Sequence, residues 1–207
     1  MTQRFVAVLL LASYCLAQTT DRKEITVSSS ILSKYVGTYQ MAPGANMMIT
    51  LAGDQLMSQM SGQGKIPLFA ESETMFFPKV VDAEIEFGTD DKGRYLILHQ
   101  NGRDMRAPRT SDTVAEKKEI SVAPAILAAY VGTYELRPGF DMVVTLEGNQ
   151  LITQATGQGK LPIFPESENK FFPKLIDAEI EFFKDATGSV TSLILHQGPN
   201  EIKGTRK

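Results

Sequence analysis

The sequence predicts an all-β protein made of two tandem copies of one small antiparallel domain, each a barrel or a sandwich entered by a short helix. Two observations carry this prediction. The phrase "FFPKVVDAEIEF" at 76–87 returns as "FFPKLIDAEIEF" at 171–182, and short apolar runs separated by turn residues recur along both copies. Many short strands at regular spacing are typical of all-β barrels and sandwiches.

The N-terminus predicts a secretory signal peptide at 1–17. Arg4 precedes an apolar run at 5–16, and the small residues Cys15 and Ala17 favour cleavage after Ala17. The run is shorter than the roughly 20 residues that a membrane span needs. A buried N-terminal strand or helix is the alternative, disfavoured because "QTTDRKE" follows at once. We therefore expect an exported chain, periplasmic or extracellular, that begins at Gln18 with a tail at 18–24.

The duplication organises almost all of the remaining chain. Residues 24–93 align without a gap with residues 119–188 at an offset of 119 − 24 = 95, and more than half of the paired positions are identical. A polar stretch at 109–118 predicts a linker. We therefore expect a first domain at 25–108 and a second at 119–207, each large enough to fold alone.

The elements follow in the same order in both copies. The segments "SSSILSKYVG" and "APAILAAYVG" predict one or two helical turns, and the Gly-Thr-Tyr that ends each of them begins the first strand. Gly53-Asp54 and Gly148-Asn149, each between two apolar runs, predict β-hairpins because glycine adopts positive φ without steric cost. Further strands follow, and a last hairpin closes each copy.

The strand "DAEIEF" alternates with a period of two. In the second copy Ala178, Ile180 and Phe182 share one face, and the three acidic residues Asp177, Glu179 and Glu181 share the other. The first copy repeats this pattern at 82–87. The strand therefore predicts an apolar inner face and a solvated acidic outer face.

These motifs, in this order, resemble one known family. The run "YVGTYEL…TLEGNQLITQATGQGKLPIFPESENKFFPKLIDAEIEFFKD…GSVTSLILHQ" is similar to the small C-terminal domain of beta-lactamase-related, penicillin-binding-protein-like serine peptidases. The resemblance implies a lipocalin-like barrel without an established activity. In that family the domain follows a catalytic domain, whereas this chain has two such domains and no hydrolase. We therefore expect tandem lipocalin-like β-barrels.

The sequence predicts no enzyme, cofactor or metal site. Gly-x-Ser-x-Gly is absent, and we expect no Ser-x-x-Lys pattern in either copy and therefore no serine hydrolysis. The repeated "GQGK" lacks the other residues of a phosphate loop. His99 and His196 have no second histidine or cysteine nearby in sequence, so zinc is not expected. The formal charge of −3 argues against a nucleic-acid partner.

Binding is then expected at the barrel rims, and large apolar side chains are expected to fill the interiors. The candidate rim residues are Gln63, Lys65, Gln158, Lys160, His99 and His196. The leading hypothesis is an exported non-catalytic binding or accessory protein. The alternative is a protein-interaction or oligomerisation module that assists a separately encoded serine hydrolase. The expected partners are such a hydrolase, an envelope peptide or a small ligand.

Overall fold

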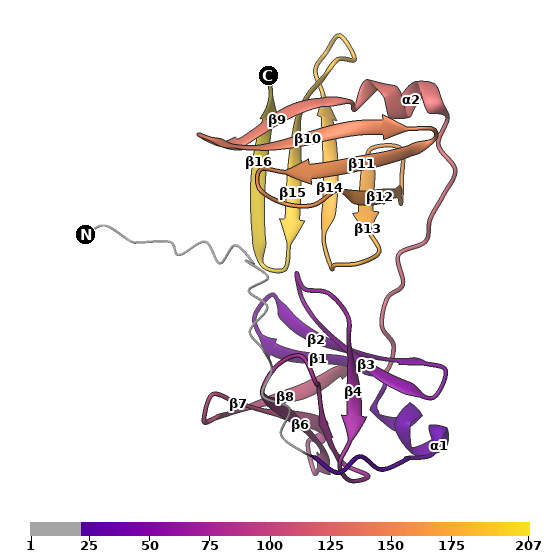
Figure 1. The fold of residues 1–207 in the computed structure, drawn as a ribbon, viewed down its shortest axis with the longest axis vertical. Coiled ribbons are helices and arrows are strands. Elements are labelled where there is room, and N and C mark those ends of the chain that lie inside the picture. Colours follow the sequence, from indigo (N-terminus) through magenta and orange to yellow (C-terminus); the bar gives the residue numbers. More distant parts are fainter. Residues whose placement is uncertain (1–21) are drawn as a thin grey trace, which may run out of the picture.

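The computed structural model describes residues 22–207, so the predicted signal peptide and its cleavage site lie outside the described residues. The chain forms two closed, antiparallel eight-stranded barrels, one after the other (Figure 1). The predicted all-β architecture of two tandem barrels is confirmed, and closure excludes the sandwich alternative. In each barrel, strands that follow one another in sequence also pair side by side, which gives a simple up-and-down topology.

The first barrel begins with the predicted short helix. This is α1 at Ser29–Leu32, followed by the 3-10 turn η1 at Ser33–Tyr35. The strands are β1 Gly37–Ala42, β2 Ala45–Ala52, β3 Gln55–Met60, β4 Ile66–Ala70, β5 Met75–Phe77, β6 Ala83–Asp90, β7 Gly93–Gln100 and β8 Arg103–Ser111. Closure pairs β8 with β1 through Tyr39↔Arg109 and Thr38↔Ser111. The barrel therefore runs past the predicted boundary at Pro108, because β1 needs this pairing to leave no open edge.

The second barrel repeats this plan. Helix α2 at Pro124–Ala129 starts with proline, which suits the first helical turn because proline has no N–H to satisfy. The strands are β9 Gly132–Arg137, β10 Phe140–Glu147, β11 Gln150–Ala155, β12 Leu161–Pro165, β13 Lys170–Pro173, β14 Glu179–Lys184, β15 Val190–Gln197 and β16 Asn200–Arg206. Strand β16 closes on β9 through Thr205↔Glu135 and Arg206↔Tyr134.

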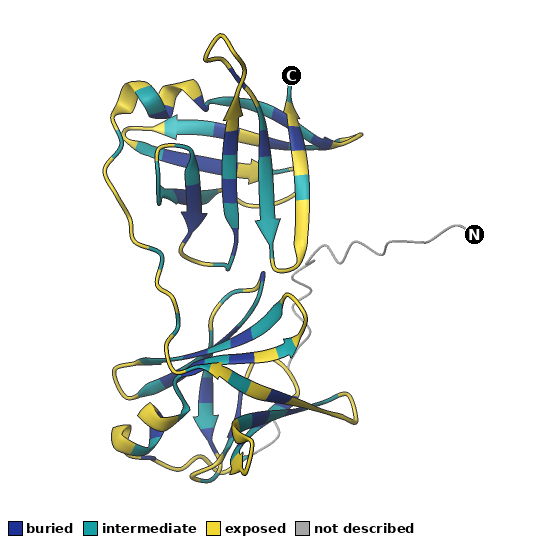
Figure 2. Ribbon diagram, turned by 180° about the vertical axis from the view of Figure 1, so that it is seen from behind, coloured by how far each residue is buried: buried dark blue, intermediate teal, exposed yellow. Residues whose placement is uncertain are grey.

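Each barrel has its own apolar core. Burial alternates along the strands, as Figure 2 shows, and the "DAEIEF" strand buries the predicted face in both copies. In the second barrel Phe182 is 1% exposed and stacks on Tyr130 with the ring centroids 4.5 Å apart. The buried Tyr134 hydroxyl donates to the backbone oxygen of Tyr130 at 2.8 Å, so the core holds this polar group without an unpaired donor.

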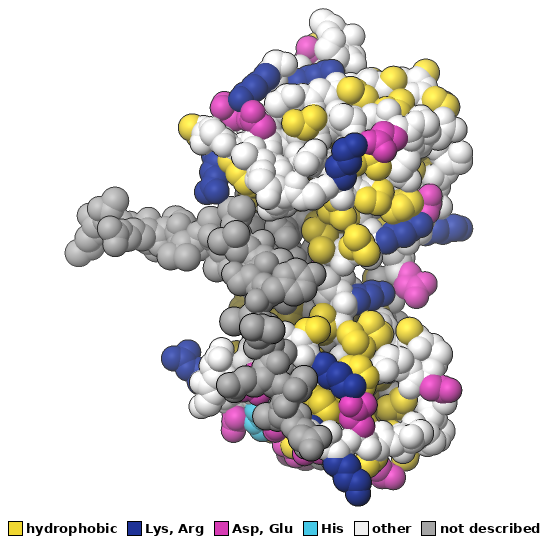
Figure 3. Space-filling view, in the orientation of Figure 1, with side chains coloured by type: hydrophobic (Ala, Val, Ile, Leu, Met, Phe, Trp, Pro, Cys, Tyr) yellow, Lys and Arg dark blue, Asp and Glu magenta, His cyan; other side chains and the backbone are white. Residues whose placement is uncertain are grey.

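The two barrels meet at the ends that lie away from their helices (Figure 1). The turn 61–64, between β3 and β4, contacts the second barrel at Ile176, Asp177 and residues 197–198, and Pro199 lies against Gly44 in the turn between β1 and β2. On the face seen in Figure 3, hydrophobic side chains gather on both sides of this junction. Two of the exposed large hydrophobic residues, Val80 and Leu175, occupy equivalent loops at these ends, since 175 − 80 = 95.

Candidate functional site

The six predicted rim residues lie in different parts of the structure. Gln63 lies in the turn at the junction, where its backbone oxygen accepts a hydrogen bond from the Asp177 N–H at 3.0 Å. Its counterpart Gln158 is exposed, and so is Lys65. Lys160 is exposed as well, and its amine donates to Glu147 at 2.6 Å. The four residues therefore do not form one common binding site.

The two histidines lie on the outer faces of β7 and β15, each beside an acidic residue. His99 Nδ1 lies 2.7 Å from Asp104 Oδ1, and His196 Nδ1 lies 3.3 Å from Glu201 Oε1. The hydrogen bond with Asp104 raises the pKa of His99, against a smaller opposing effect of burial. These contacts are the ordinary surface pairing that a strand-end histidine makes.

The second barrel brings Glu179, Glu181 and His196 together on its outer face, with one ligand atom of each within 4.8 Å of the others. Two lysines lie within reach of the same carboxylates: Lys170 Nζ is 3.1 Å from Glu179 and 3.7 Å from Glu181, and Lys117 Nζ is 3.7 Å from Glu179. Burial by itself raises the pKa of Glu179, but the Lys170 hydrogen bond and the nearby positive charges outweigh it and lower that pKa. Ammonium groups therefore take the places that a cation would occupy.

The expectation that no Ser-x-x-Lys pattern occurs is wrong for the second copy. Ser167 and Lys170 have this spacing, in the turn that leads from β12 into β13. The Ser167 hydroxyl donates to Asn169 at 3.1 Å, and the Lys170 amine bonds to Glu179 at 3.1 Å. The hydrogen bond from Lys170 to Glu179 raises the pKa of the lysine, which opposes a role as general base. The spacing is therefore present without the nucleophile–base contact that the chemistry requires.

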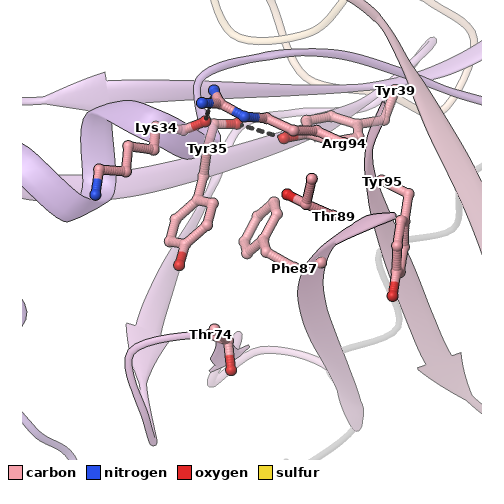
Figure 4. Close-up of a pocket in the computed structure, with 9 residues that line it drawn as sticks. Lys34, Tyr35, Tyr39, Thr74, Phe87, Thr89, Arg94 and Tyr95 are labelled. Carbon is pink, nitrogen blue, oxygen red and sulfur yellow. Dashed lines mark hydrogen bonds between the residues drawn. The ribbon is translucent and has the colours of Figure 1, made fainter. Parts of the chain in front are cut away.

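Among the described residues, one cavity with converging side chains lies at the helix end of the first barrel. This tyrosine pocket has a volume of about 250 Å³ and is lined by Lys34, Tyr35, Tyr39, Thr74, Phe87, Gly88, Thr89, Arg94 and Tyr95. Figure 4 shows the rings of Tyr35 and Phe87 side by side at its centre. Their centroids are 4.2 Å apart and nearly parallel, at 14°.

Each aromatic side chain of the tyrosine pocket is held by a neighbour. The Tyr35 hydroxyl donates to the Glu73 backbone oxygen at 2.9 Å, and the Tyr39 hydroxyl donates to the Tyr35 oxygen at 2.9 Å. Arg106 lies 4.0 Å from the ring centroid of Tyr95, and Gly88 leaves room for that ring because any Cβ there would collide with it. The walls of the pocket are therefore preformed.

The tyrosine pocket combines neutral aromatic walls with a basic mouth. Burial raises the pKa of Tyr39 to about 12, and burial together with the charge of Glu73 raises the pKa of Tyr35. Both hydroxyls therefore stay protonated at neutral pH. The lining side chains that carry a full charge are both basic, Lys34 and Arg94, and both are exposed. Arg94 donates to the Lys34 backbone oxygen at 3.0 Å, which uses one of its five N–H groups (Figure 4).

In the second barrel, larger side chains cover the position equivalent to the tyrosine pocket. Phe183 and Lys184 stand where the first copy has Gly88 and Thr89, and the Lys184 amine lies 5.8 Å from the ring centroid of Tyr130. Tyr130, the counterpart of Tyr35, is 0% exposed. Sequence reasoning missed the pocket because it compared the copies for their identities. The pocket is indicated instead by two positions at which the copies differ, Gly88 and Thr89, near the tyrosine that both copies share.

A second cavity, of about 480 Å³, lies at the helix end of the second barrel. It opens between the segment 119–122 and the barrel, and its walls include Asn149, Gln150 and Pro165. The backbone N–H of Ile120 donates to the Pro165 oxygen at 2.9 Å and holds that segment in place. This groove is shaped mainly by backbone and carries no comparable group of aromatic rings.

Fold and cavities together define a tandem small-barrel protein with an aromatic pocket in its first barrel. The chain belongs to the family described as a domain of unknown function, DUF3471, which matches it twice, at 21–107 and 116–206. It is also similar to Penicillin-binding protein 4* of Bacillus subtilis (strain 168), with 33% identity over 91 residues. That alignment covers 44% of this chain and 20% of the Bacillus protein, so the chain corresponds to about a fifth of that relative.

Among solved structures, a protein of unknown function from Nostoc punctiforme, of the DUF3598 family, aligns with 87% of this chain and 100% of its own. The sequence identity is 12% and the TM-score is 0.20, a likeness too low to support any inference. Within residues 22–207, none of the helices has the length and apolar character needed to cross a membrane.

Proposed function

We propose that this chain is an exported, non-catalytic accessory protein that binds its partner through the tyrosine pocket of the first barrel. The observation that carries the proposal is the pocket's opening in one copy and closure in the other. A purely structural feature would be expected in both copies, because both barrels use the same core. Tyr35 is half-buried in the first copy, where Gly88 and Thr89 replace bulkier side chains, whereas its counterpart Tyr130 is 0% exposed.

The size of the pocket indicates what it binds. Pockets for whole drug-sized ligands have volumes of about 300–1,000 Å³, whereas this one has about 250 Å³. It therefore suits a single planar side chain, packed against the Tyr35 ring, with a carboxylate at the mouth beside Lys34 and Arg94. A peptide segment with an aromatic residue next to an acidic group or a free C-terminus meets these requirements.

The test uses 3-phenylpropionate, which joins an aromatic ring to a carboxylate. In an NMR titration we expect saturable shifts at Tyr35, Phe87 and Tyr95, with a dissociation constant of roughly 1 mM for so small a probe. Thr89→Lys copies the residue that covers Tyr130 in the second barrel and should abolish these shifts. Lys184→Thr is the matched control, since it leaves the first pocket intact. Unchanged binding by the Thr89→Lys chain would refute the site.

One observation favours a second candidate function. The similarity to Penicillin-binding protein 4* links this type of domain to a longer chain named for penicillin binding. The chain would then assist a separately encoded serine hydrolase. Affinity capture from a cell-envelope extract, followed by fluorescent-penicillin labelling, tests this. If the labelled band is lost with Thr89→Lys, the hydrolase binds through the tyrosine pocket and both proposals hold. If the band persists, the hydrolase contacts another part of the chain.

A further inference from the structure

The contact between the two barrels uses different parts of the two copies. The first barrel contributes what we call the docking turn, 61–64. The second contributes the receiving surface, made of Ile176, Asp177 and the turn 197–199. Each copy contains both parts in its sequence. One docking turn, 156–159, and one receiving surface, Val81 and Asp82 with the turn 100–102, are therefore left without this contact.

The occupied contact depends on backbone groups and two side chains. The Gly62 N–H donates to Asp177 Oδ2 at 3.2 Å, and the Gln197 side chain donates to the Gly62 oxygen at 2.9 Å. Gly64 and Ile176 form an antiparallel bridge. The contact needs glycines because a Cβ at Gly64 would lie 3.1 Å from the Leu175 oxygen. These requirements account for the two glycines of "GQGK" in the first copy.

The spare docking turn keeps every group that the occupied one uses. Gly157, Gln158 and Gly159 repeat the docking residues at the offset of 95, and the turn is exposed along its whole length. Gly62 is buried at the junction, whereas Gly157 is exposed. No atom lies within 4 Å of a Cβ placed on Gly157 or Gly159.

The spare receiving surface is equally accessible. Asp82 repeats Asp177, and Gln100 repeats Gln197 at the end of the corresponding strand. The Asp82 side chain is 96% exposed, and Val81, in the place of Ile176, is 39% exposed. Asp82 makes a 3.5 Å contact with Arg22. Lys117 is the counterpart of Arg22 in the second copy, and it lies beside the occupied receiving surface, 3.7 Å from Glu179. A basic residue at this position is therefore compatible with docking.

Two differences weaken the spare surface. Gly102 replaces Pro199, whose Cβ lies 3.4 Å from a Cβ placed on Gly44 of the first barrel. Asn101 replaces Gly198, and a Cβ at position 198 would lie 3.2 Å from the Ser61 oxygen. The two residues share the same turn conformation, with φ of 53° and 56°, so the docked backbone must shift by a few tenths of an ångström. The second contact should be weaker than the first, which also benefits from the covalent linker.

We propose that the docking turn 156–159 of one chain binds the Val81–Asp82 surface of a second copy of the same chain, as turn 61–64 does within the chain. Such a head-to-tail contact is heterologous, so it extends the assembly until the rotation between barrels closes a ring. An interface made of so few contacts is expected to be weak, with a dissociation constant of roughly 10 µM to 1 mM.

Sedimentation velocity of the purified chain across that concentration range tests the proposal. We expect the mean mass to rise with concentration. Asp82→Ala removes the carboxylate that accepts the Gly157 N–H and should weaken association by about tenfold. Asp91→Ala is the matched control, because it removes the same charge from an exposed turn at the opposite end of the same barrel. Equal association by the two variants would overturn the assignment of this surface.

Gly159→Val tests the other half of the contact. Its side chain meets open space within one chain, but in the docked pair it would strike the Val80 backbone, as a side chain at Gly64 would strike Leu175. We expect this variant to stay monomeric with an unchanged melting temperature. A wild-type chain that stays monomeric throughout the range would overturn the proposal, and so would association that survives Gly159→Val.

Discussion

Replacing Phe182 by alanine should unfold the second barrel under conditions in which the first remains folded. Phe182 is 1% exposed and lies at the centre of an aromatic cluster. Its ring stacks on Tyr130 at 4.5 Å and meets Tyr134 and Phe171 edge-on at 5.7 and 5.6 Å. The neighbouring strands are tied to one another by backbone hydrogen bonds, so they cannot collapse fully into the space left by the ring.

The expected magnitude follows from this burial. Truncation of a buried phenylalanine to alanine costs about 3–5 kcal/mol. That range already includes the lost contacts of the ring, and since Phe182 makes three aromatic contacts we expect the upper part of it, about 4–5 kcal/mol. A domain of this size has a total stability of roughly 5–10 kcal/mol. The variant should therefore lose about 40% or more of the stability of its second barrel.

The adjacent residue supplies the control. Phe183 points outward from the same strand and is 36% exposed, so Phe183→Ala should cost less than about 1 kcal/mol. Urea unfolding followed by circular dichroism should show a separate early transition for Phe182→Ala, with the first barrel unfolding later as in the wild type. If the curves of the two variants coincide, Phe182 does not support the core as the structure indicates.

Further tests concern the surface and the domain organisation. Because the raised pKa of His99 means that its protonated form stabilises the fold, that stability should be present below pH 6.5 and fade as pH rises through the raised value; thermal melts of His99→Gln should lack this dependence. Lys170→Met, which copies the first barrel, should raise the pKa of Glu179 in an NMR titration. Residues 22–111 and 116–207, expressed separately, should each give a folded circular dichroism spectrum. N-terminal sequencing of exported protein should find Gln18 first, and a lipid on Cys15 would contradict that site.

The sequence was sufficient to predict the barrels because each local signal agreed with the others. Period-two burial in "DAEIEF", glycine turns at Gly53 and Gly148 and the duplication itself all require the same strands. The end of β8 was harder to place, since "RAPRTS" is polar and only its pairing with β1 shows that it is a strand. Only Ala107 is buried along β8, so a period-two pattern does not mark the end of this strand at Ser111.

The candidate sites depend on contacts between residues that the order of motifs along the sequence does not place together. The tyrosine pocket arises because Gly88 allows the Tyr95 ring to lie across β6, a contact between residues on adjacent strands. The junction arises because one copy of "GQGK" lies against the other copy's "LIDAE", which no pattern within a domain can indicate. Both sites are found by comparing the surroundings of equivalent residues in the two copies. The list of repeated residues does not indicate them.

The two proposed binding regions of the first barrel should act independently. Asp82 lies just before β6 begins, whereas Thr89 lies near its far end, about 20 Å away along the strand. The strand between them is fixed by pairing with β7 from Ala83↔Gln100 to Asp90↔Gly93, and its inward residues are packed in the core. Effects of changes this far apart, with no shared partner, normally add within about 0.5 kcal/mol. The Asp82→Ala, Thr89→Lys double variant should therefore lose self-association and 3-phenylpropionate binding to the same extents as the two single variants. A clear departure from additivity, measured by combining the sedimentation and NMR titrations, would show that the barrel couples its two ends.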